Sequence, residues 1–244
     1  MSKGLKHIVS FSGGKDSTAM LLKMIEKDMR IDEIVYCDTG MDFPCVYRHI
    51  EKIIKQTHRN ITILKPDNSF EWFLSKYEKK NKNSKYGHIL GLGWPGFMFR
   101  WCTGNLKTKI FDRYIKDKNA IVYLGIASDE KKRLERKHHR ANYYSLKYPL
   151  IDFEMTEEDC LKYSYEQGYD WEGYYKLFRR LSCWCCPLQR IGELRTLYKE
   201  FPDLWKELQR LDKLSYRQFR SDYSVDELEQ KFDKENALLE NPVV

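Results

Sequence analysis

Short apolar runs, separated by segments of mixed polarity, dominate the first half of the chain. Four runs have the length and the β-branched content of buried strands, at residues 8–11, 32–37, 60–64 and 120–124. The segments between them carry apolar residues at helical spacing, which predicts helices over residues 17–27, 45–57 and 69–79. Strands that alternate with helices in this way predict an α/β fold with a parallel sheet.

Strand patterns stop after about residue 153, and the remaining pattern is helical. A helix over 156–167 opens with T-E-E-D, in which Thr156 can cap the amide of Asp159 and Asp159 can reach back. Further helices are expected over residues 193–199, 203–214 and 225–239. We therefore expect a nucleotide-binding α/β domain over residues 1–153 and a helical C-terminal region over residues 154–244.

Composition narrows the class of protein. Hydrophobic residues make up 42% and aromatic residues 14% of the 244 positions, which argues against a disordered chain. The net charge of +7 suits a nucleotide or nucleic-acid partner, and equally a lysine-rich solvated surface. No apolar run approaches the roughly 20 residues of a membrane span, and the N-terminal pattern is not that of a signal peptide. We expect a cytoplasmic protein without a membrane partner.

A segment rich in glycine and hydroxyl groups, S-G-G-K-D-S at residues 12–17, joins the first predicted strand to the first predicted helix. Its glycines let backbone amides approach an anion, and the helix start offers unpaired N–H groups and the positive end of its dipole. Lys15 adds a cation, and Ser12 and Ser17 add hydroxyl donors. The spacing is neither a Walker A pattern nor G-x-G-x-x-G. The segment predicts a phosphate-binding loop, with a flexible turn as the simpler alternative.

The same six residues resemble the PP-loop of the ATP pyrophosphatase superfamily, whose members share an adenine nucleotide α-hydrolase-like (HUP, Rossmann-like) fold and typically split ATP into AMP and pyrophosphate. Three later segments are similar to the superfamily's branch of phosphoadenosine phosphosulfate (PAPS) reductase-like proteins: C-D-T-G at 37–40, R-W-C-T at 100–103 with Leu106-Lys107, and G-I-A-S-D-E-K-K-R at 125–133. The resemblance covers roughly residues 7–190.

The resemblance implies the roles of several residues. Lys15, Asp16, Lys107 and Arg133 are the expected catalytic residues, with Asp16 and Asp38 helping to hold Mg²⁺. The expected nucleotide contacts are Ser10, Phe11, Ser12, Gly13, Gly14, Lys15, Asp16, Ser17, Asp38, Thr39 and Gly125.

Three of the seven cysteines cluster in C-W-C-C at residues 183–186. A C-x-x-C turn lets two thiolates reach one metal ion or cluster. Resemblance to iron–sulfur APS reductases implies a [4Fe–4S] cluster on Cys102, Cys183 and Cys186, although Trp101 stands where those proteins have a further cysteine. Cys160 and Cys185 are the candidates for the fourth ligand, and we expect Cys160. Zinc, a redox-active pair and simple burial are the alternatives.

Sulfonucleotide reductases resemble one another in a C-terminal catalytic cysteine, whereas this sequence has no cysteine after Cys186. We therefore expect a PAPS reductase-like protein that adenylates an acceptor with ATP, releases pyrophosphate and serves sulfur transfer, as in DNA phosphorothioation or nucleic-acid thiolation. A sulfur-donor protein and a nucleic-acid acceptor are the partners implied.

Reduction of a sulfonucleotide is one alternative function, and a non-catalytic nucleotide or nucleic-acid binding module is another. The basic run at residues 131–140 could contact phosphates, although a solvated helix face is the simpler interpretation. Trp94, Phe97, Phe99 and Trp101 could stack bases if exposed, but most are expected to lie in the core or in the long loop predicted over residues 79–96.

Overall fold

A five-stranded parallel sheet forms the centre of the computed structural model, which describes residues 4–78, 90–130, 133 and 144–240. The strand order β3-β2-β1-β4-β5 is typical of the adenine nucleotide α-hydrolase fold, so the predicted fold class is confirmed. The strands are β1 (Lys6–Phe11), β2 (Glu33–Cys37), β3 (Ile61–Leu64), β4 (Ala120–Leu124) and β5 (Tyr144–Lys147).

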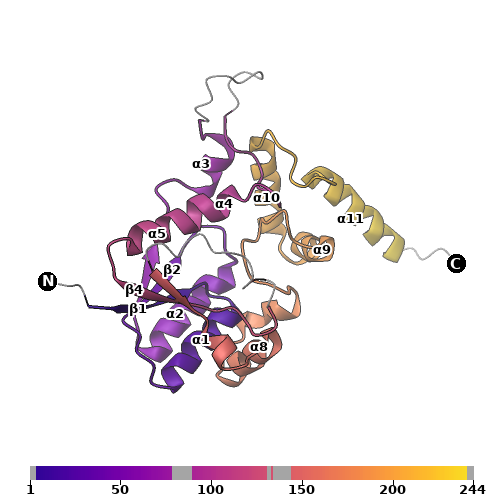
Figure 1. Cartoon of the computed structure of the whole chain (residues 1–244). Helices are drawn as coiled ribbons and strands as arrows, with labels where there is room; N and C mark the ends of the chain where they lie inside the picture. Colours follow the sequence, from indigo (N-terminus) through magenta and orange to yellow (C-terminus); the bar gives the residue numbers. More distant parts are fainter. Residues whose placement is uncertain (1–3, 79–89, 131–132, 134–143, 241–244) are drawn as a thin grey trace. The chain divides into compact units, whose positions relative to one another are not determined.

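Helices cover the sheet on both faces, as the buried apolar strands require. Figure 1 shows α1 (Lys15–Glu26) and α2 (Pro44–Thr57) on one side of the sheet and α5 (Lys109–Ile115) on the other. On the α5 face, Phe111 and Ile115 pack with the strand residues Ile8, Val35, Ala120, Val122 and Tyr144. The short α7 (Pro149–Asp152) and α8 (Glu157–Glu166) pack against α1. The capping box predicted at Thr156 and Asp159 is present.

The chain folds into two compact units. The sheet unit comprises Met1–Pro66 and Asn105–Ser182, and the helical unit comprises Asp67–Gly104 and Cys183–Val244. This division differs from the expected boundary near residue 153, because α8 packs on α1 within the sheet unit. The π-helix η1 (Gly104–Thr108) spans the junction, and the 3₁₀ segment η2 (Trp171–Lys176) belongs to the sheet unit.

Buried aromatic side chains form much of the core of the helical unit. Trp94 and Trp101 are buried, and Phe70 lies against both rings. Their indole N–H groups donate hydrogen bonds to Asp212 (2.6 Å) and to the Gly93 carbonyl (2.9 Å). The helices of this unit are α3 (Phe70–Ser75), α4 (Trp101–Thr103), α9 (Ile191–Glu200), α10 (Pro202–Leu214) and α11 (Val225–Glu240).

Two predicted segments fall largely outside the described residues. They are residues 79–89 of the long loop and the basic run at 131–140, of which only Arg133 is described. In the described ranges, no helix combines the length and apolar character needed to cross a membrane.

His49 of α2 is a buried polar residue that ties α2 to α1. Its Nε2 lies 2.9 Å from the Thr18 hydroxyl, and its ring stacks on Trp171 with centroids 4.4 Å apart. Burial lowers the pKa of His49 to about 3; nearby Lys52 lowers it further and Asp170 opposes the shift. The imidazole is therefore neutral in the folded protein near neutral pH.

This depressed pKa predicts acid sensitivity. Between pH 6.5 and about 3, the unfolded chain binds a proton at His49 that the folded chain does not, so stability falls as pH falls. From about pH 7.5 to about pH 5, this one group should remove about 2 kcal/mol of unfolding free energy. Urea unfolding at the two pH values measures this loss of unfolding free energy. In His49→Gln the loss should be smaller than in the wild type by about 2 kcal/mol. An equal loss in variant and wild type would contradict the assignment.

Candidate phosphate-loop site

The loop between β1 and α1 is held by its own hydroxyl groups. The amide of Ser12 donates to the Ser17 hydroxyl (3.1 Å), which in turn donates to the Gly14 carbonyl (3.0 Å). Gly13 has φ +74°, and a Cβ atom there would lie 2.7 Å from Val46, so only glycine fits. The sequence-predicted loop residues thus form a compact turn at the carboxyl end of β1.

Gly125 brings the end of β4 against this loop. Ser10 of β1 pairs with Leu124 of β4, so the two strands end side by side. A Cβ at Gly125 would lie only 2.9 Å from the Ser17 amide nitrogen. Glycine at this position therefore allows the β4 loop to reach the start of α1, and any larger residue would push the two apart.

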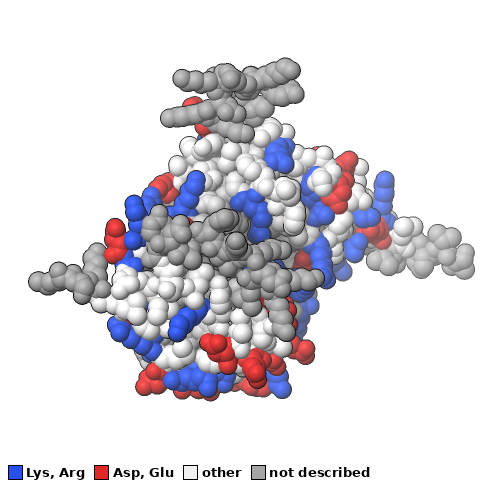
Figure 2. Space-filling model, in the orientation of Figure 1, with Lys and Arg blue, Asp and Glu red and all other residues white. Residues whose placement is uncertain are grey.

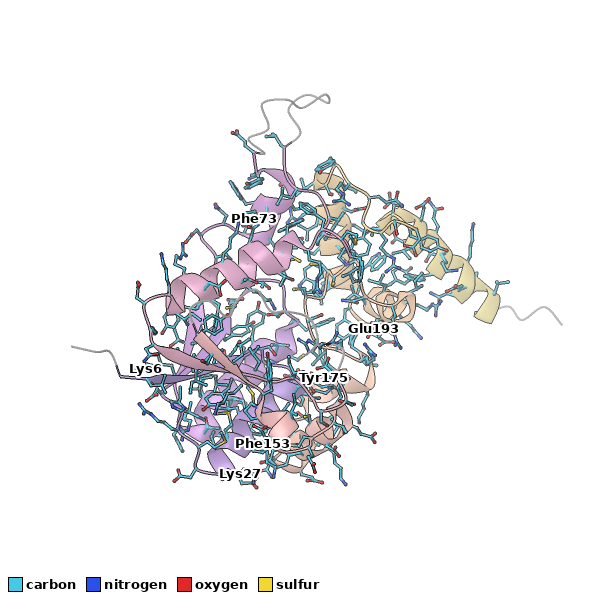
Figure 3. The ribbon with its side chains drawn as sticks, in the orientation of Figure 1. Lys6, Lys27, Phe73, Phe153, Tyr175 and Glu193 are labelled. Atoms are coloured by element: carbon cyan, nitrogen blue, oxygen red, sulfur yellow. The ribbon has the colours of Figure 1, made fainter. Side chains whose placement is uncertain are left out.

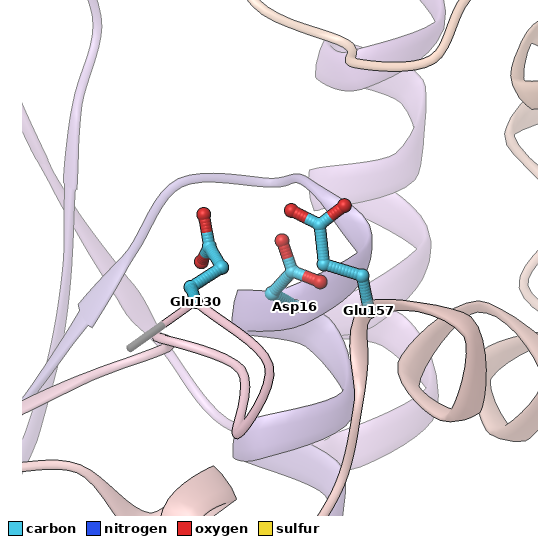
Figure 4. Close-up of side chains that lie close together, drawn as sticks. All are labelled: Asp16, Glu130 and Glu157. Carbon is cyan, nitrogen blue, oxygen red and sulfur yellow. The ribbon is translucent and has the colours of Figure 1, made fainter. Parts of the chain in front are cut away.

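Three carboxylates gather at Lys15. Asp16, Glu130 and Glu157 offer oxygen atoms that all lie within 4.8 Å of one another, and Figure 4 shows Glu130 and Glu157 on either side of Asp16. The Lys15 ammonium lies 2.6 Å from Asp16 and 3.6 Å from Glu157. Burial raises the pKa of Asp16, with Lys15 opposing the shift and Glu157 and Glu130 adding to it. Carboxylate oxygens in this arrangement could hold a divalent cation such as Mg²⁺.

Sequence reasoning found Asp16 but missed Glu130 and Glu157. Glu130 follows β4, and Glu157 begins α8, where its backbone amide donates a hydrogen bond to the Asp129 carboxylate (3.1 Å). Glu130 lies in the segment of residues 125–133 and Glu157 in the capping-box sequence T-E-E-D. Acidic residues are common at helix starts, so their spacing alone carries no signal of a shared site.

Arginine side chains flank the carboxylates. Arg133 donates to Glu130 at 2.8 Å, and Arg180 lies 3.4 Å from the same carboxylate. Arg133 therefore lies beside the three-carboxylate group, where it is paired with Glu130. Lys107 lies in η1, and its carbonyl lies 3.8 Å from the Cys37 sulfur at the end of β2.

Asp38 and Thr39 follow β2 and form part of its turn. Asp38 accepts hydrogen bonds from the Gly40 amide (2.8 Å) and the Tyr47 hydroxyl (3.1 Å). The buried Thr39 accepts from the Met41 amide (3.3 Å). Asp38 is not a member of the three-carboxylate group, so the structure brings Asp16 together with Glu130 and Glu157 and not with Asp38.

Aromatic residues of η2 pack on the phosphate loop. The Trp171 indole donates to the Gly13 carbonyl (2.8 Å), and the Lys15 amide donates to the Tyr175 hydroxyl (2.8 Å; Figure 3 labels Tyr175). Trp171 and Glu172 both have positive φ, an uncommon backbone state for residues other than glycine. Burial raises the pKa of Tyr175, so its hydroxyl stays protonated. The Tyr175 hydroxyl accepts the hydrogen bond of the Lys15 amide, at the start of α1, that a bound anion would otherwise accept.

The cysteines divide between the two units. Cys183 and Cys186 close a turn in which the Cys186 amide donates to the Cys183 carbonyl (3.2 Å). Burial raises the pKa of Cys185, and the neighbouring Cys183, Cys186 and Cys102 add to the shift. These four thiols therefore lie near one another in the helical unit.

Cys160 lies in the sheet unit, on α8. It is fully buried, and burial raises the pKa of its thiol to about 12, with Asp16 adding to the shift. Its neighbourhood is that of the phosphate loop, whereas Cys102, Cys183 and Cys185 belong to the helical unit.

The Tyr175 contact leads to a test of phosphate binding. A phosphate that takes the Lys15 amide must displace the tyrosine hydroxyl, so Tyr175→Phe should bind ATP up to about fivefold more tightly, the equivalent of about 1 kcal/mol. The same change should lower the unfolding free energy by about 1 kcal/mol, because a hydrogen bond is lost. Calorimetric titration and urea unfolding measure the two effects. Tyr165→Phe, on α8, is the matched control, and weaker ATP binding by Tyr175→Phe would contradict displacement.

The chain is similar in sequence to several proteins that are described as uncharacterized. Two uncharacterized proteins of Methanocaldococcus jannaschii are 25% and 26% identical to this chain over 82% and 95% of its length. An uncharacterized nin region protein of Escherichia phage lambda is 28% identical over 76% of this chain and 68% of its own. The chain spans only 40% and 54% of the two Methanocaldococcus proteins.

Among solved structures, a phosphoadenylyl-sulfate (PAPS) reductase from Candida auris in a phosphate complex matches with a TM-score of 0.48 and 17% identity, over 74% of this chain and 81% of that one. The model of the phosphoadenosine phosphosulfate reductase domain matches residues 6–189. This match covers most of the chain, from β1 through the C-W-C-C segment, and the chain belongs to the phosphoadenosine phosphosulfate reductase domain family.

Proposed function

We propose that this protein binds ATP with Mg²⁺ on the loop of residues 12–17 and cleaves it between the α- and β-phosphates, adenylating an acceptor for sulfur transfer. The observation that carries the proposal is the group of Asp16, Glu130 and Glu157 around Lys15. A polyphosphate placed beside three carboxylates is repelled unless a cation lies between them. Mg²⁺ binds carboxylate and phosphate oxygens together and removes that repulsion.

The same electrostatics favour ATP over a sulfonucleotide. ATP carries a triphosphate that chelates Mg²⁺ and so brings its own counter-ion to the carboxylates. Among the described residues, Lys15, Arg133 and Arg180 pair with the carboxylates and would offset their charge towards a sulfonucleotide bound without metal. Family membership agrees with nucleotide binding in either case, so the metal dependence of binding distinguishes the two nucleotides.

The chemistry follows from these side chains. An acceptor oxygen forms a bond to the α-phosphorus, and the bond from that phosphorus to the bridging oxygen breaks. Pyrophosphate leaves, and Lys15, Lys107 and Arg133 offset its developing charge. Sulfur at the sulfide level, from a sulfur-donor protein, then replaces the adenylated oxygen. AMP leaves with that oxygen, so no net oxidation or reduction takes place.

The four cysteines of the helical unit fit a thiolate-bound metal group. We propose Cys102, Cys183, Cys185 and Cys186 as its ligands, and Cys185 replaces the expected Cys160 because Cys160 lies beside Asp16 in the sheet unit. A [4Fe–4S] cluster is the proposed group because the C-x-x-C turn with Cys102 matches the ligands that the family resemblance implies, and zinc is the alternative for the same thiolates. When bound, the cluster would supply a site for holding sulfur.

Metal dependence tests the nucleotide proposal. ATP should bind about tenfold or more tightly with Mg²⁺ than with a chelator, a difference of about 1.4 kcal/mol or more. Glu157→Gln and Glu130→Gln should each shrink that ratio, since each removes a metal ligand. Glu158→Gln is the matched control, because Glu158 is the exposed neighbour of Glu157 on α8. Metal-independent ATP binding, or tighter binding of metal-free PAPS, would contradict the proposal.

Metal analysis tests the ligand set. Protein purified without oxygen should contain iron and inorganic sulfide, and Cys185→Ala should lose them. Cys160→Ala, which replaces an equally buried thiol, should retain them. If Cys160→Ala lost iron and Cys185→Ala kept it, Cys160 and not Cys185 would be the fourth ligand. One zinc ion per chain without iron would contradict the cluster.

A further inference from the structure

The helical unit presents two large apolar side chains to water at the tip of a tight turn. Gly96 and Phe99 exchange backbone hydrogen bonds of 3.2 and 3.1 Å, so Phe97 and Met98 occupy the two central positions. Their exposed fractions are 76% and 90%. Such positions ordinarily carry glycine, asparagine or aspartate. Packing within the unit does not require Phe97 and Met98 to be apolar, and an exposed apolar patch of this kind marks an interaction site.

Cations and further aromatic rings adjoin this tip. The Arg217 guanidinium lies 5.8 Å from the centre of the half-exposed Phe99 ring, and Arg100 follows directly. Tyr216 is 54% exposed. Together these residues form what we call the turn surface: Phe97, Met98, Phe99, Arg100, Tyr216 and Arg217. Residues 96–100 and 213–217, which supply it, contain no aspartate or glutamate.

The turn surface rests on a fixed base. The Arg217 stem packs on Gly93, where a Cβ would lie 2.7 Å from it. The Trp101 indole donates to the Gly93 carbonyl (2.9 Å), and the Tyr216 hydroxyl donates to the Leu92 carbonyl (3.3 Å). The backbone at Leu92 and Gly93, beneath the turn, is therefore fixed by these contacts. Binding at a preformed surface loses little conformational entropy.

Charge and shape indicate the partner. Basic and acidic side chains both occur on the face drawn in Figure 2, whereas the two segments that supply the turn surface contain arginine and no acidic residue. Aromatic faces interleaved with arginine match the alternating bases and phosphates of an unpaired strand. We propose that the turn surface binds single-stranded nucleic acid, with bases on Phe97, Phe99 and Tyr216 and phosphates at Arg100 and Arg217.

This inference deepens the proposed function, and it rests on that function only for the claim that the bound strand is the acceptor. Trp94 and Trp101, which the sequence also offered as stacking residues, are buried and take no part. Binding of the strand can be measured without ATP. Failure of nucleotide cleavage and failure of strand binding are therefore separate results.

Fluorescence anisotropy of the full chain with a labelled oligonucleotide of about 20 unpaired nucleotides tests the surface, with DNA and RNA of the same sequence as two arms. Phe97→Ala should weaken binding about fivefold or more, because one stacked base is lost. Arg100→Gln should weaken binding and lower the salt slope by about one. Leu238→Ala changes another exposed apolar residue, on α11, and should leave binding unchanged. Phe97 is exposed, so its variant should fold, which circular dichroism checks.

Equal affinities of Phe97→Ala and wild type for both oligonucleotides would overturn the proposal. Binding that depends on Phe97 but is seen only with duplex DNA, or only with vesicles of anionic phospholipid, would also overturn it. Lys15→Ala should retain strand binding. If Lys15→Ala lost strand binding while Phe97→Ala kept it, the nucleic acid would bind at the loop of residues 12–17. That result would contradict binding at the turn surface.

Discussion

The buried charge of Lys15 organises the candidate site. Its ammonium lies between Asp16 and Glu157, while Glu130 is paired with Arg133 and Arg180. Three carboxylates thus face three cations before any ligand binds. A nucleotide adds several negative charges to this group, and in a poorly hydrated site that addition is strongly unfavourable without a counter-ion. The proposed binding of a nucleotide together with a divalent cation would remove that unfavourable interaction.

The sheet topology explains how residues far apart in sequence reach one site. β1 and β4 are neighbours in the order 3-2-1-4-5, so the loops at their carboxyl ends meet. Gly125 lets the β4 loop approach the first turn of α1, and α8 packs on α1 with Glu157 at its start. The site therefore depends on the crossover between the two halves of the sheet, where ligands of open α/β sheets bind.

Local patterns in the sequence predicted the parts that depend on local geometry. The strands β1, β2, β3 and β4 and the capping box at Thr156 all carry short-range signals, and each is present, as is a compact turn at residues 12–17 between β1 and α1. The strand β5 has the sequence Y-S-L-K, which is too short and polar for a strand pattern to stand out. Glu130 and Glu157 were missed because tertiary packing, and not spacing, brings them to Asp16.

The division into units was harder to predict for the same reason. The helical unit joins Asp67–Gly104 with Cys183–Val244, two segments separated by 78 residues of the sheet unit, Asn105–Ser182. Composition does not reveal such pairing, because both segments look like ordinary helical chain. Family resemblance implied that Cys102 groups with Cys183 and Cys186, whereas the position of Cys185 near these three thiols, and of Cys160 near Asp16, depends on tertiary packing that the sequence does not reveal.

The products formed from ATP test the central claim most directly. Full-length protein purified without oxygen would be incubated with ATP and Mg²⁺, with water as the acceptor, and the phosphorus-containing products separated and identified. We predict AMP and pyrophosphate in equal amounts, and their loss in Lys15→Ala. Formation of ADP and orthophosphate, or release of sulfite from PAPS in place of ATP cleavage, would contradict the account.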